Sequence, residues 1–204
     1  MTHDVTALVE GGFDGLIFDC DGTLVDTAPA HLRALQIALA ANGQEMTPEW
    51  YYPKVGLTPA ALLDQYEREV AALAVTRQLL VERYTVAFHE SLGAMREVEV
   101  IAALAREWKG RVPLAVASNG QKSNVKASLR VTGLLGLFDF VVAAEDVKRG
   151  KPEPDMFLEA ARRMGVAAER CVVFEDSDEG LTAARRAGMD ERDIRLVFVP
   201  EWAR

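Results

Sequence analysis

Short apolar runs alternate with helical patterns through most of this chain, and this alternation is what most restricts its fold. Each run has the length and composition of a buried strand, and apolar residues between the later runs recur at helical spacing. The expected strands cover residues 16–18, 113–117, 138–142, 171–174 and 195–199, and the intervening helices cover residues 98–109, 122–132, 155–164 and 180–187. Strands connected in this way pair in parallel, with helices on both faces of the sheet. The sequence therefore predicts an α/β fold whose ligands bind at the C-terminal ends of the strands.

A helical block separates the first strand from the others. No strand-like run occurs between Val25 and Val98. Three helices are expected in this interval, over residues 27–42, 58–70 and 73–92, with a loop over residues 46–56. The block predicts a small helical insertion between two strands of the core.

Composition excludes several classes of function. The chain has 204 residues, of which 50% are hydrophobic, and a formal net charge of −8, so it lacks the basic footprint of a nucleic-acid-binding protein. It contains no apolar run of membrane-spanning length, and its first residues do not read as a signal peptide. Its two cysteines, Cys20 and Cys171, both fall in expected strands, where they fit small buried side chains in a reducing compartment. We therefore expect a cytoplasmic globular protein.

Two carboxylates follow the first strand. Asp19 and Asp21 are spaced so that both point to the same side of an extended chain, and Gly22 provides a turn after them. Carboxylates this close repel each other unless a cation lies between them, and Mg²⁺ favours such oxygen ligands. An Asx-rich turn is the simpler alternative. A calcium loop does not fit, because position 23 is Thr where that signature requires a carboxylate or amide.

Three other strand ends carry polar residues suited to phosphate chemistry. Ser118 and Asn119 follow the second strand, where they can bind a phosphate oxygen, cap the next helix, or do both. Lys151 follows the third strand and precedes a proline, which keeps it off the following helix. Glu175 and Asp176 follow the fourth strand, and buried acids there need a cation or hydrogen bonds. A surface lysine and an acidic helix cap are the simpler alternatives, but four coincident strand ends argue against them.

This ordered set resembles the four motifs of the haloacid dehalogenase-like hydrolase superfamily, and the resemblance covers nearly the whole chain. It implies a Rossmann-like core of residues 1–25 and 98–204, with residues 26–97 as a small inserted α-helical cap. Within the superfamily, the chain is similar to the beta-phosphoglucomutase-like phosphatases. The stretch from Cys171 resembles bacterial sugar-phosphate phosphatases that act on fructose 1-phosphate or 6-phosphogluconate.

The resemblance also implies a two-step phosphoryl transfer. Asp19 is expected to attack phosphorus and form an aspartyl-phosphate, while Asp21 protonates the leaving alcohol and later takes a proton from water. Lys151 is expected to offset charge on the nucleophile and the phosphoryl group. The further implied site residues are the phosphate-binding Ser118 and Asn119, the Mg²⁺ ligands Asp19, Asp21 (through its carbonyl), Asp176 and Glu175, and the cap specificity loop Val55, Gly56, Leu57 and Thr58.

Two alternative functions are weighed against this reading. A hexose-phosphate mutase is slightly favoured by His31, which we otherwise expect to be structural or hinge-related. The mutase pattern is opposed by Pro59 and Gln121, which stand where mutases have an arginine and a lysine, although Lys54 and Lys122 lie nearby. A catalytically inactive binding module is the alternative of another class. Such a module is expected to lack Asp19, Asp21, Lys151 or Asp176, and the chain contains all four. We expect a monomer that acts on a small phosphorylated metabolite.

Overall fold

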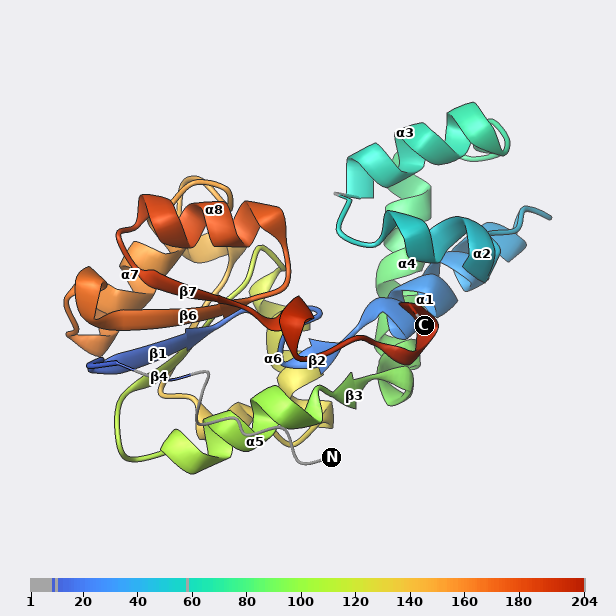
Figure 1. Ribbon diagram of the computed structural model, residues 1–204. Helices are drawn as coiled ribbons and strands as arrows, with labels where there is room; N and C mark the ends of the chain where they lie inside the picture. Colours follow the sequence, from blue (N-terminus) through green and yellow to red (C-terminus); the bar gives the residue numbers. More distant parts are fainter. Residues whose placement is uncertain (1–8, 10, 58, 204) are drawn as a thin grey trace. The chain divides into compact units, whose positions relative to one another are not determined.

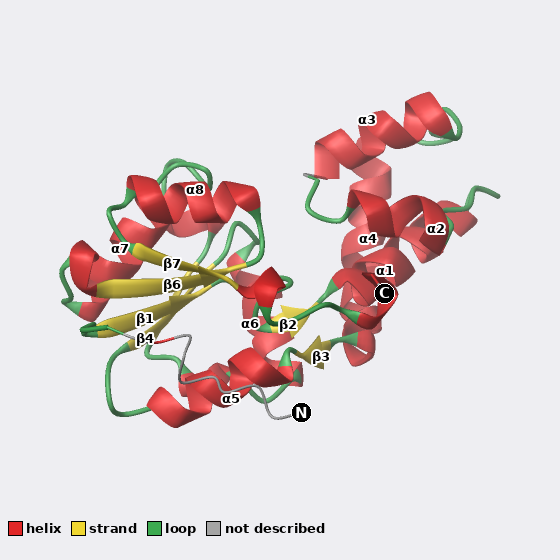
Figure 2. Ribbon diagram, in the orientation of Figure 1, coloured by secondary structure: helices red, strands yellow, loops and turns green. Residues whose placement is uncertain are grey.

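The computed structural model describes residues 9, 11–57 and 59–203, which form two compact units. The core unit comprises the described residues up to Asp26 together with Arg96–Val199. The helical unit comprises the described residues of Thr27–Met95 and of the segment Pro200–Arg204. Figure 2 shows the strands in the core unit and a mainly helical second unit.

The core unit is built on one parallel sheet of five strands in the order β5-β4-β1-β6-β7. Its strands are β1 Gly15–Phe18, β4 Leu114–Ala117, β5 Phe140–Val142, β6 Cys171–Glu175 and β7 Asp190–Asp193. Its α-helices are α5 Glu99–Trp108, α6 Lys122–Val131, α7 Asp155–Met164 and α8 Asp178–Arg186. Helices α7 and α8 lie over one face of the sheet and α5 lies on the other (Figure 1). This arrangement confirms the predicted α/β fold with a Rossmann-like sheet.

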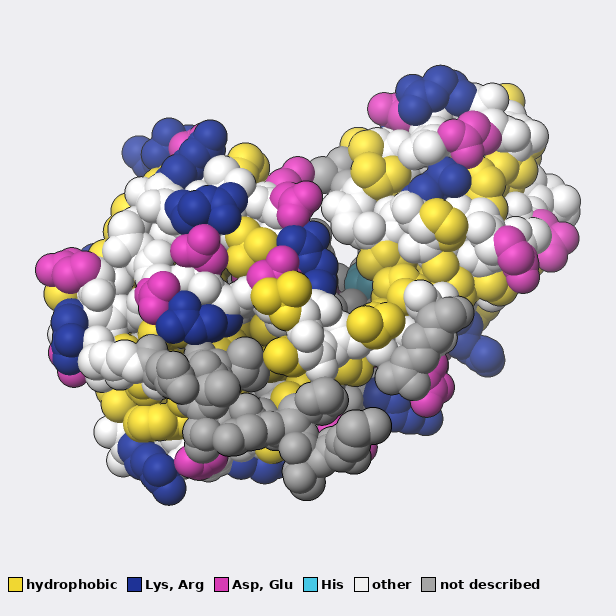
Figure 3. All heavy atoms as spheres, in the orientation of Figure 1, with side chains coloured by type: hydrophobic (Ala, Val, Ile, Leu, Met, Phe, Trp, Pro, Cys, Tyr) yellow, Lys and Arg dark blue, Asp and Glu magenta, His cyan; other side chains and the backbone are white. Residues whose placement is uncertain are grey.

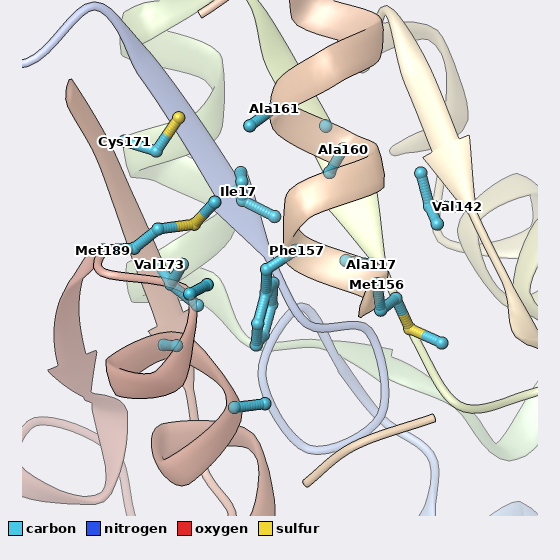
Figure 4. Packing of buried hydrophobic residues seen from close by; sticks show 14 of the residues in the cluster. Ile17, Ala117, Val142, Met156, Phe157, Ala160, Ala161, Cys171, Val173 and Met189 are labelled. Carbon is cyan, nitrogen blue, oxygen red and sulfur yellow. The ribbon is translucent and has the colours of Figure 1, made fainter. Parts of the chain in front are cut away.

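Apolar side chains fill the space between the sheet and its helices. Ile17, Ala115 and Val173 come from three neighbouring strands and share one buried apolar cluster with Phe157 of α7. Figure 4 shows the Phe157 ring beside these strands, with Met156 on the same helix. Because side chains alternate along a strand, the intervening residues of β1 and β6 face the other way. There Phe18 stacks on Phe174, with ring centroids 4.8 Å apart.

The helical unit contains four α-helices, which are α1 Ala28–Ala40, α2 Pro48–Tyr51, α3 Pro59–Glu69 and α4 Arg77–Ser91. Helices α1 and α4 pack against each other, and their buried residues share an apolar cluster with α2 and α3. Thr47 and Thr76 cap α2 and α4, since each side chain accepts a backbone N–H from the first turn. Short 3₁₀ turns complete both units: η2 Tyr52–Lys54, η3 Leu92–Ala94, η4 Leu135–Leu137, η5 Ala144–Asp146, η6 Ala168–Arg170, η7 Ile194–Leu196 and η8 Glu201–Ala203.

Four details of the structure differ from the sequence-based expectation. The last strand covers Asp190–Asp193 instead of residues 195–199, because a short turn at Gly188 brings the chain directly beside β6. Two-residue strands β2 Val25–Asp26 and β3 Arg96–Glu97 pair antiparallel, where no strand was expected. Helix α2 interrupts the expected loop. Cys20 is buried in the turn after β1, not within a strand.

Charged side chains of both signs are interspersed over the visible surface, and neither sign forms a continuous stripe (Figure 3). Many form pairs, for example Arg163 with Asp146 and Arg185 with Glu191. Among the described residues, no helix combines the length and apolar character needed to cross a bilayer.

Candidate active site

The polar residues singled out at the strand ends meet at the carboxyl edge of the sheet in the core unit. Asp19 follows β1 directly, and its backbone N–H donates to the Phe174 carbonyl of β6 at 3.0 Å. Glu175 is the last residue of β6, and Ser118 follows β4. The parallel pairing of β1 with both β4 and β6 brings these three strand ends together.

Lys151 forms ion pairs with Asp19, which follows β1, and with Glu175 at the end of β6. Its Nζ lies 2.5 Å from Asp19 Oδ1 and 3.0 Å from Glu175 Oε2, and all three residues are buried. The ammonium also lies 4.9 Å from the centre of the Phe157 ring. Lys151 reaches this position from the loop between β5 and α7, where a cis peptide bond joins it to Pro152. The lysine is therefore a buried ion-pair partner and not a solvated surface residue.

Asp176 is held by the turn that follows β1. Thr23 Oγ1 donates to Asp176 Oδ1 at 2.7 Å across 153 residues of sequence. Gly22 has φ of +91°, and a Cβ placed there would lie 2.2 Å from Asp176 Oδ2. Position 22 therefore requires glycine both for its backbone conformation and for the space that the carboxylate occupies.

Glu175 is oriented by the residues that begin α8. Ser177 Oγ donates to Glu175 Oε1 at 2.5 Å, and the same hydroxyl accepts the Gly180 N–H at 3.0 Å as the helix cap. A Cβ at Gly180 would lie 2.0 Å from Glu175 Cδ. Sequence reasoning did not single out Ser177 and missed its hydrogen bond to Glu175. The sequence signal for this contact is the short spacing in the run Glu175-Asp176-Ser177, where the serine follows the acid by two residues.

Ser118 and Asn119 contact other site residues through their side chains. Ser118 Oγ donates to Asp21 Oδ2 at 3.2 Å. The Asn119 amide nitrogen donates to the Lys151 carbonyl at 3.2 Å, and its oxygen accepts the Lys151 N–H at 2.9 Å. Gly150 leaves room for this pair, because a Cβ there would lie 2.5 Å from Asn119 Oδ1. Asn119 therefore clamps the backbone of the lysine, a role that the sequence did not suggest.

Negative charge exceeds positive charge at the centre of this site. Burial and the Glu175 carboxylate hold the pKa of Asp19 well above its usual range. Burial and Glu175 also raise the pKa of Asp176 to about 7. Burial lowers the pKa of Lys151, but the Asp19 and Glu175 carboxylates outweigh that effect, so its pKa lies above the usual value. One ammonium thus faces three carboxylates that destabilise one another in their charged forms.

A divalent cation fits this arrangement. One carboxylate oxygen from each of Asp19, Glu175 and Asp176 lies within 4.8 Å of the others. All the donors are oxygen atoms, which suits Mg²⁺, and a bound cation would offset the mutual repulsion of the acids.

The other predicted site residues belong to the helical unit. Val55, Gly56 and Leu57 form the loop between η2 and α3, and Thr58 lies outside the described residues. His31 is on α1, where its Nδ1 lies 2.5 Å from the Tyr84 hydroxyl of α4 and its ring stacks on Phe88. Tyr84 and Phe88 both belong to α4 of the helical unit.

Comparisons with known proteins agree with this geometry. Residues 16–191 match the family model of the haloacid dehalogenase-like hydrolases. The chain is 38% identical to the fructose-1-phosphate phosphatase YqaB of Escherichia coli K12, over 91% of this chain and 98% of that protein. It is 34% identical to hexitol phosphatase A of the same bacterium, over 85% of this chain and 79% of that protein. The crystal structure of CbbY from Rhodobacter sphaeroides with phosphate has a TM-score of 0.74 and 29% identity, over 88% of this chain and 84% of that one.

These similarities confirm the predicted resemblance to sugar-phosphate phosphatases of the beta-phosphoglucomutase-like group. They also confirm that the chain is an enzyme of the phosphoric monoester hydrolase class. The family match spans most of the sequence and includes Asp19, Lys151 and Glu175, which meet at the edge of the sheet. The chain belongs to the haloacid dehalogenase-like hydrolase family.

Proposed function

We propose that this protein is a Mg²⁺-dependent phosphatase that hydrolyses a small sugar phosphate through an aspartyl-phosphate on Asp19. The observation that carries this proposal is the buried contact of Lys151 with Asp19 and Glu175, beside Asp176. A carboxylate paired with a lysine in a buried site is suited to attack an anionic phosphoryl group, because the ammonium offsets the repulsion between them.

In the first step, a carboxylate oxygen of Asp19 forms a bond to phosphorus as the bond from phosphorus to the sugar oxygen breaks. Protonated Asp21 gives its proton to that leaving oxygen, so the sugar departs as an alcohol. The hydrogen bond from Ser118 Oγ to Asp21 Oδ2 supports this role, since it orients the carboxyl group beside the predicted phosphate site. Lys151 and the side chains of Ser118 and Asn119 are proposed to bind the phosphoryl oxygens.

In the second step, Asp21 accepts a proton from water as the water oxygen bonds to phosphorus. The bond between phosphorus and Asp19 breaks, which releases inorganic phosphate and restores the carboxylate. Bound Mg²⁺ would offset charge on the phosphoryl oxygens during both displacements. We propose Asp19, Asp176 and the carbonyl of Asp21 as its ligands. Glu175 is proposed as a further ligand that also orients Lys151, since its two oxygens accept bonds from Lys151 and Ser177 and one of them lies within 4.8 Å of oxygens of Asp19 and Asp176.

The substrate class is proposed from the relatives. Two of them are named as phosphatases of fructose 1-phosphate and of hexitol phosphates, so a small phosphorylated sugar or polyol is the natural substrate to propose. We further propose that residues 26–97 act as a cap over the core, with the loop of Val55, Gly56, Leu57 and Thr58 contributing specificity and His31 acting near the hinge. Exclusion of bulk water by such a cap would protect the aspartyl-phosphate.

Hydrolysis is favoured over a mutase reaction by the partners of two lysines. A mutase must bind a second phosphate, which calls for free cationic groups. Lys54 Nζ lies 3.3 Å from Glu69 and over the Trp50 ring, and Lys122 Nζ lies 2.7 Å from Asp146. Both lysines are thus engaged within their own units, which supports the phosphatase assignment.

The test is phosphate release from fructose 1-phosphate, 6-phosphogluconate, phosphoglycolate and β-glucose 1-phosphate, measured with Mg²⁺ and then with EDTA. We expect metal-dependent release from the sugar phosphates. Conversion of β-glucose 1-phosphate to glucose 6-phosphate without net phosphate release would establish the mutase instead. Binding of sugar phosphates without turnover in any assay would favour the inactive binding module.

A further inference from the structure

The segment after Val199 joins the helical unit, although the sheet and its last strand belong to the core unit. The chain thus crosses between the units three times, at residues 26–27, 95–96 and 199–200. The first two crossings lie beside each other, because Asp26 of β2 pairs with Arg96 of β3. The third crossing, at residues 199–200, is a separate covalent connection. The segment that follows it makes a specific side-chain contact within the helical unit.

That contact is an aromatic stack. The Trp202 ring in η8 lies parallel to the Tyr52 ring in η2, with centroids 4.9 Å apart and planes inclined by 10°. Trp202 and Tyr52 also pack, partly buried, against the apolar cluster of the helical unit. Parallel stacking of two large rings beside a core adds to the burial of their area. The segment after Val199 is therefore held on the helical unit by the packing of the Trp202 side chain.

Tyr52 lies next to the proposed specificity loop. η2 ends at Lys54, and Val55, Gly56 and Leu57 follow at once, with the Val55 and Leu57 side chains exposed. Lys54 fixes the other end of η2, since it donates to the Trp50 carbonyl and pairs with Glu69. Trp202 and Glu69 thus support the short turn from which the loop departs.

We infer that Trp202 is a positioning residue for substrate recognition, which acts through Tyr52 to hold η2 and the loop after it. The inference rests on the proposed function for the identity of the substrate. The segment after Val199 would thus connect the core unit to the proposed specificity loop through the stack of Trp202 on Tyr52.

The first test needs no turnover. Hydrogen–deuterium exchange of the backbone over residues 52–57 is compared in the wild type, Trp202→Ala, Trp202→Phe and a chain that ends after Val199. We expect exchange to rise about two- to tenfold in the alanine and shortened variants, as loss of one aromatic pair implies, and to recover in Trp202→Phe. Leu196→Ala is the matched control, because Leu196 lies in the same part of the chain, is 84% exposed and belongs to the core unit.

The second test separates recognition from chemistry. For the sugar phosphate that the wild type prefers, we expect Trp202→Ala to raise KM about two- to tenfold with little change in kcat. We expect its kinetics with acetyl phosphate, which carries no sugar, to match those of the wild type. Unchanged exchange over residues 52–57, or raised exchange with unchanged KM, overturns the inference. A wild type with no phosphatase activity overturns the proposed function instead, and the exchange result still decides whether Trp202 holds η2.

Discussion

Asp19 is the residue on which the proposed chemistry depends. Asp19→Asn keeps the size of the side chain but removes its nucleophilic charge, so we expect turnover to fall on the order of a thousandfold or more. We expect the fold to persist, because an amide oxygen can still accept the Lys151 hydrogen bond. Phosphate release measures the loss and thermal unfolding checks the fold, with Asp64→Asn on α3 as a control. Full activity in Asp19→Asn would contradict the proposed nucleophile.

The clamp between Asn119 and the Lys151 backbone supports a second prediction. Asn119→Ala removes both hydrogen bonds, and Gly150→Ala disturbs them by placing a Cβ in the space of the amide. We expect both variants to lower kcat about 10- to 100-fold, since small displacements of a catalytic group are costly.

Asn124→Ala is the matched control for the clamp, because the Asn124 side-chain oxygen has no hydrogen-bond partner among the described residues. The Gly150 variant gives the decisive comparison, since it leaves Asn119 itself in place. If Gly150→Ala turns over as fast as the wild type, positioning of Lys151 by Asn119 is unnecessary for catalysis.

The sequence predicted which residues come together in the site. It predicted few of the contacts between them. Asp19, Ser118 and Glu175 each follow a strand, so their meeting at one edge of the sheet could be foreseen from strand order alone. The bond from Thr23 to Asp176 could not be foreseen, because Thr23 lies in the turn after β1 and strand order does not fix where a turn residue points. The spatial need for glycine at position 150 likewise depends on a neighbour from another loop.

At the scale of elements, α7 carries an ion-pair cluster that should make stability depend on pH. Glu159 accepts bonds from Arg162 and Arg163, which lower its pKa to about 2. A carboxylate whose pKa falls on folding stabilises the native state above its unfolded pKa, and that stabilisation is lost as the pH falls toward the folded value. The stabilisation from Glu159 should therefore be complete above about pH 5 and decline toward pH 2.

Glu159→Gln tests this prediction. At pH 7 we expect the free energy of unfolding in urea to fall by about 1 kcal/mol, with the difference from the wild type shrinking at pH 4 and pH 3. Glu107→Gln on α5, which removes one looser 3.5 Å pair with Arg111, is the matched control. A difference that stays constant from pH 7 to pH 3 would contradict the assignment.

Most elements could be predicted because their apolar spacing agrees with their final burial, and α7 begins and ends where the spacing predicts. The last strand could not be predicted in this way. An edge strand needs only one neighbour, so the polar residues of β7 can pair with β6 while the apolar run after them forms η7 and a loop. The strands β2 and β3 are too short to leave a pattern of their own.

For the whole molecule, the crowded carboxylates predict a response to metal. Mg²⁺ should raise the melting temperature, because a cation that binds only the native state stabilises it by mass action, by about 2.7 kcal/mol at 100 times its Kd. Asp176→Asn should remove most of this rise and increase the Mg²⁺ concentration needed for half-maximal phosphate release. EDTA should return the wild-type protein to its metal-free melting temperature. An equal rise in both proteins would place the bound Mg²⁺ away from Asp176.

The sheet has an outer strand whose four residues are all ionisable, Asp190, Glu191, Arg192 and Asp193. A strand from another molecule that added to this rim would have to strip water from those charges and displace partners such as Arg185 and Arg195. Open sheet edges invite such addition when they are flat and apolar. The charges on β7 therefore disfavour the addition of another strand at this edge of the sheet.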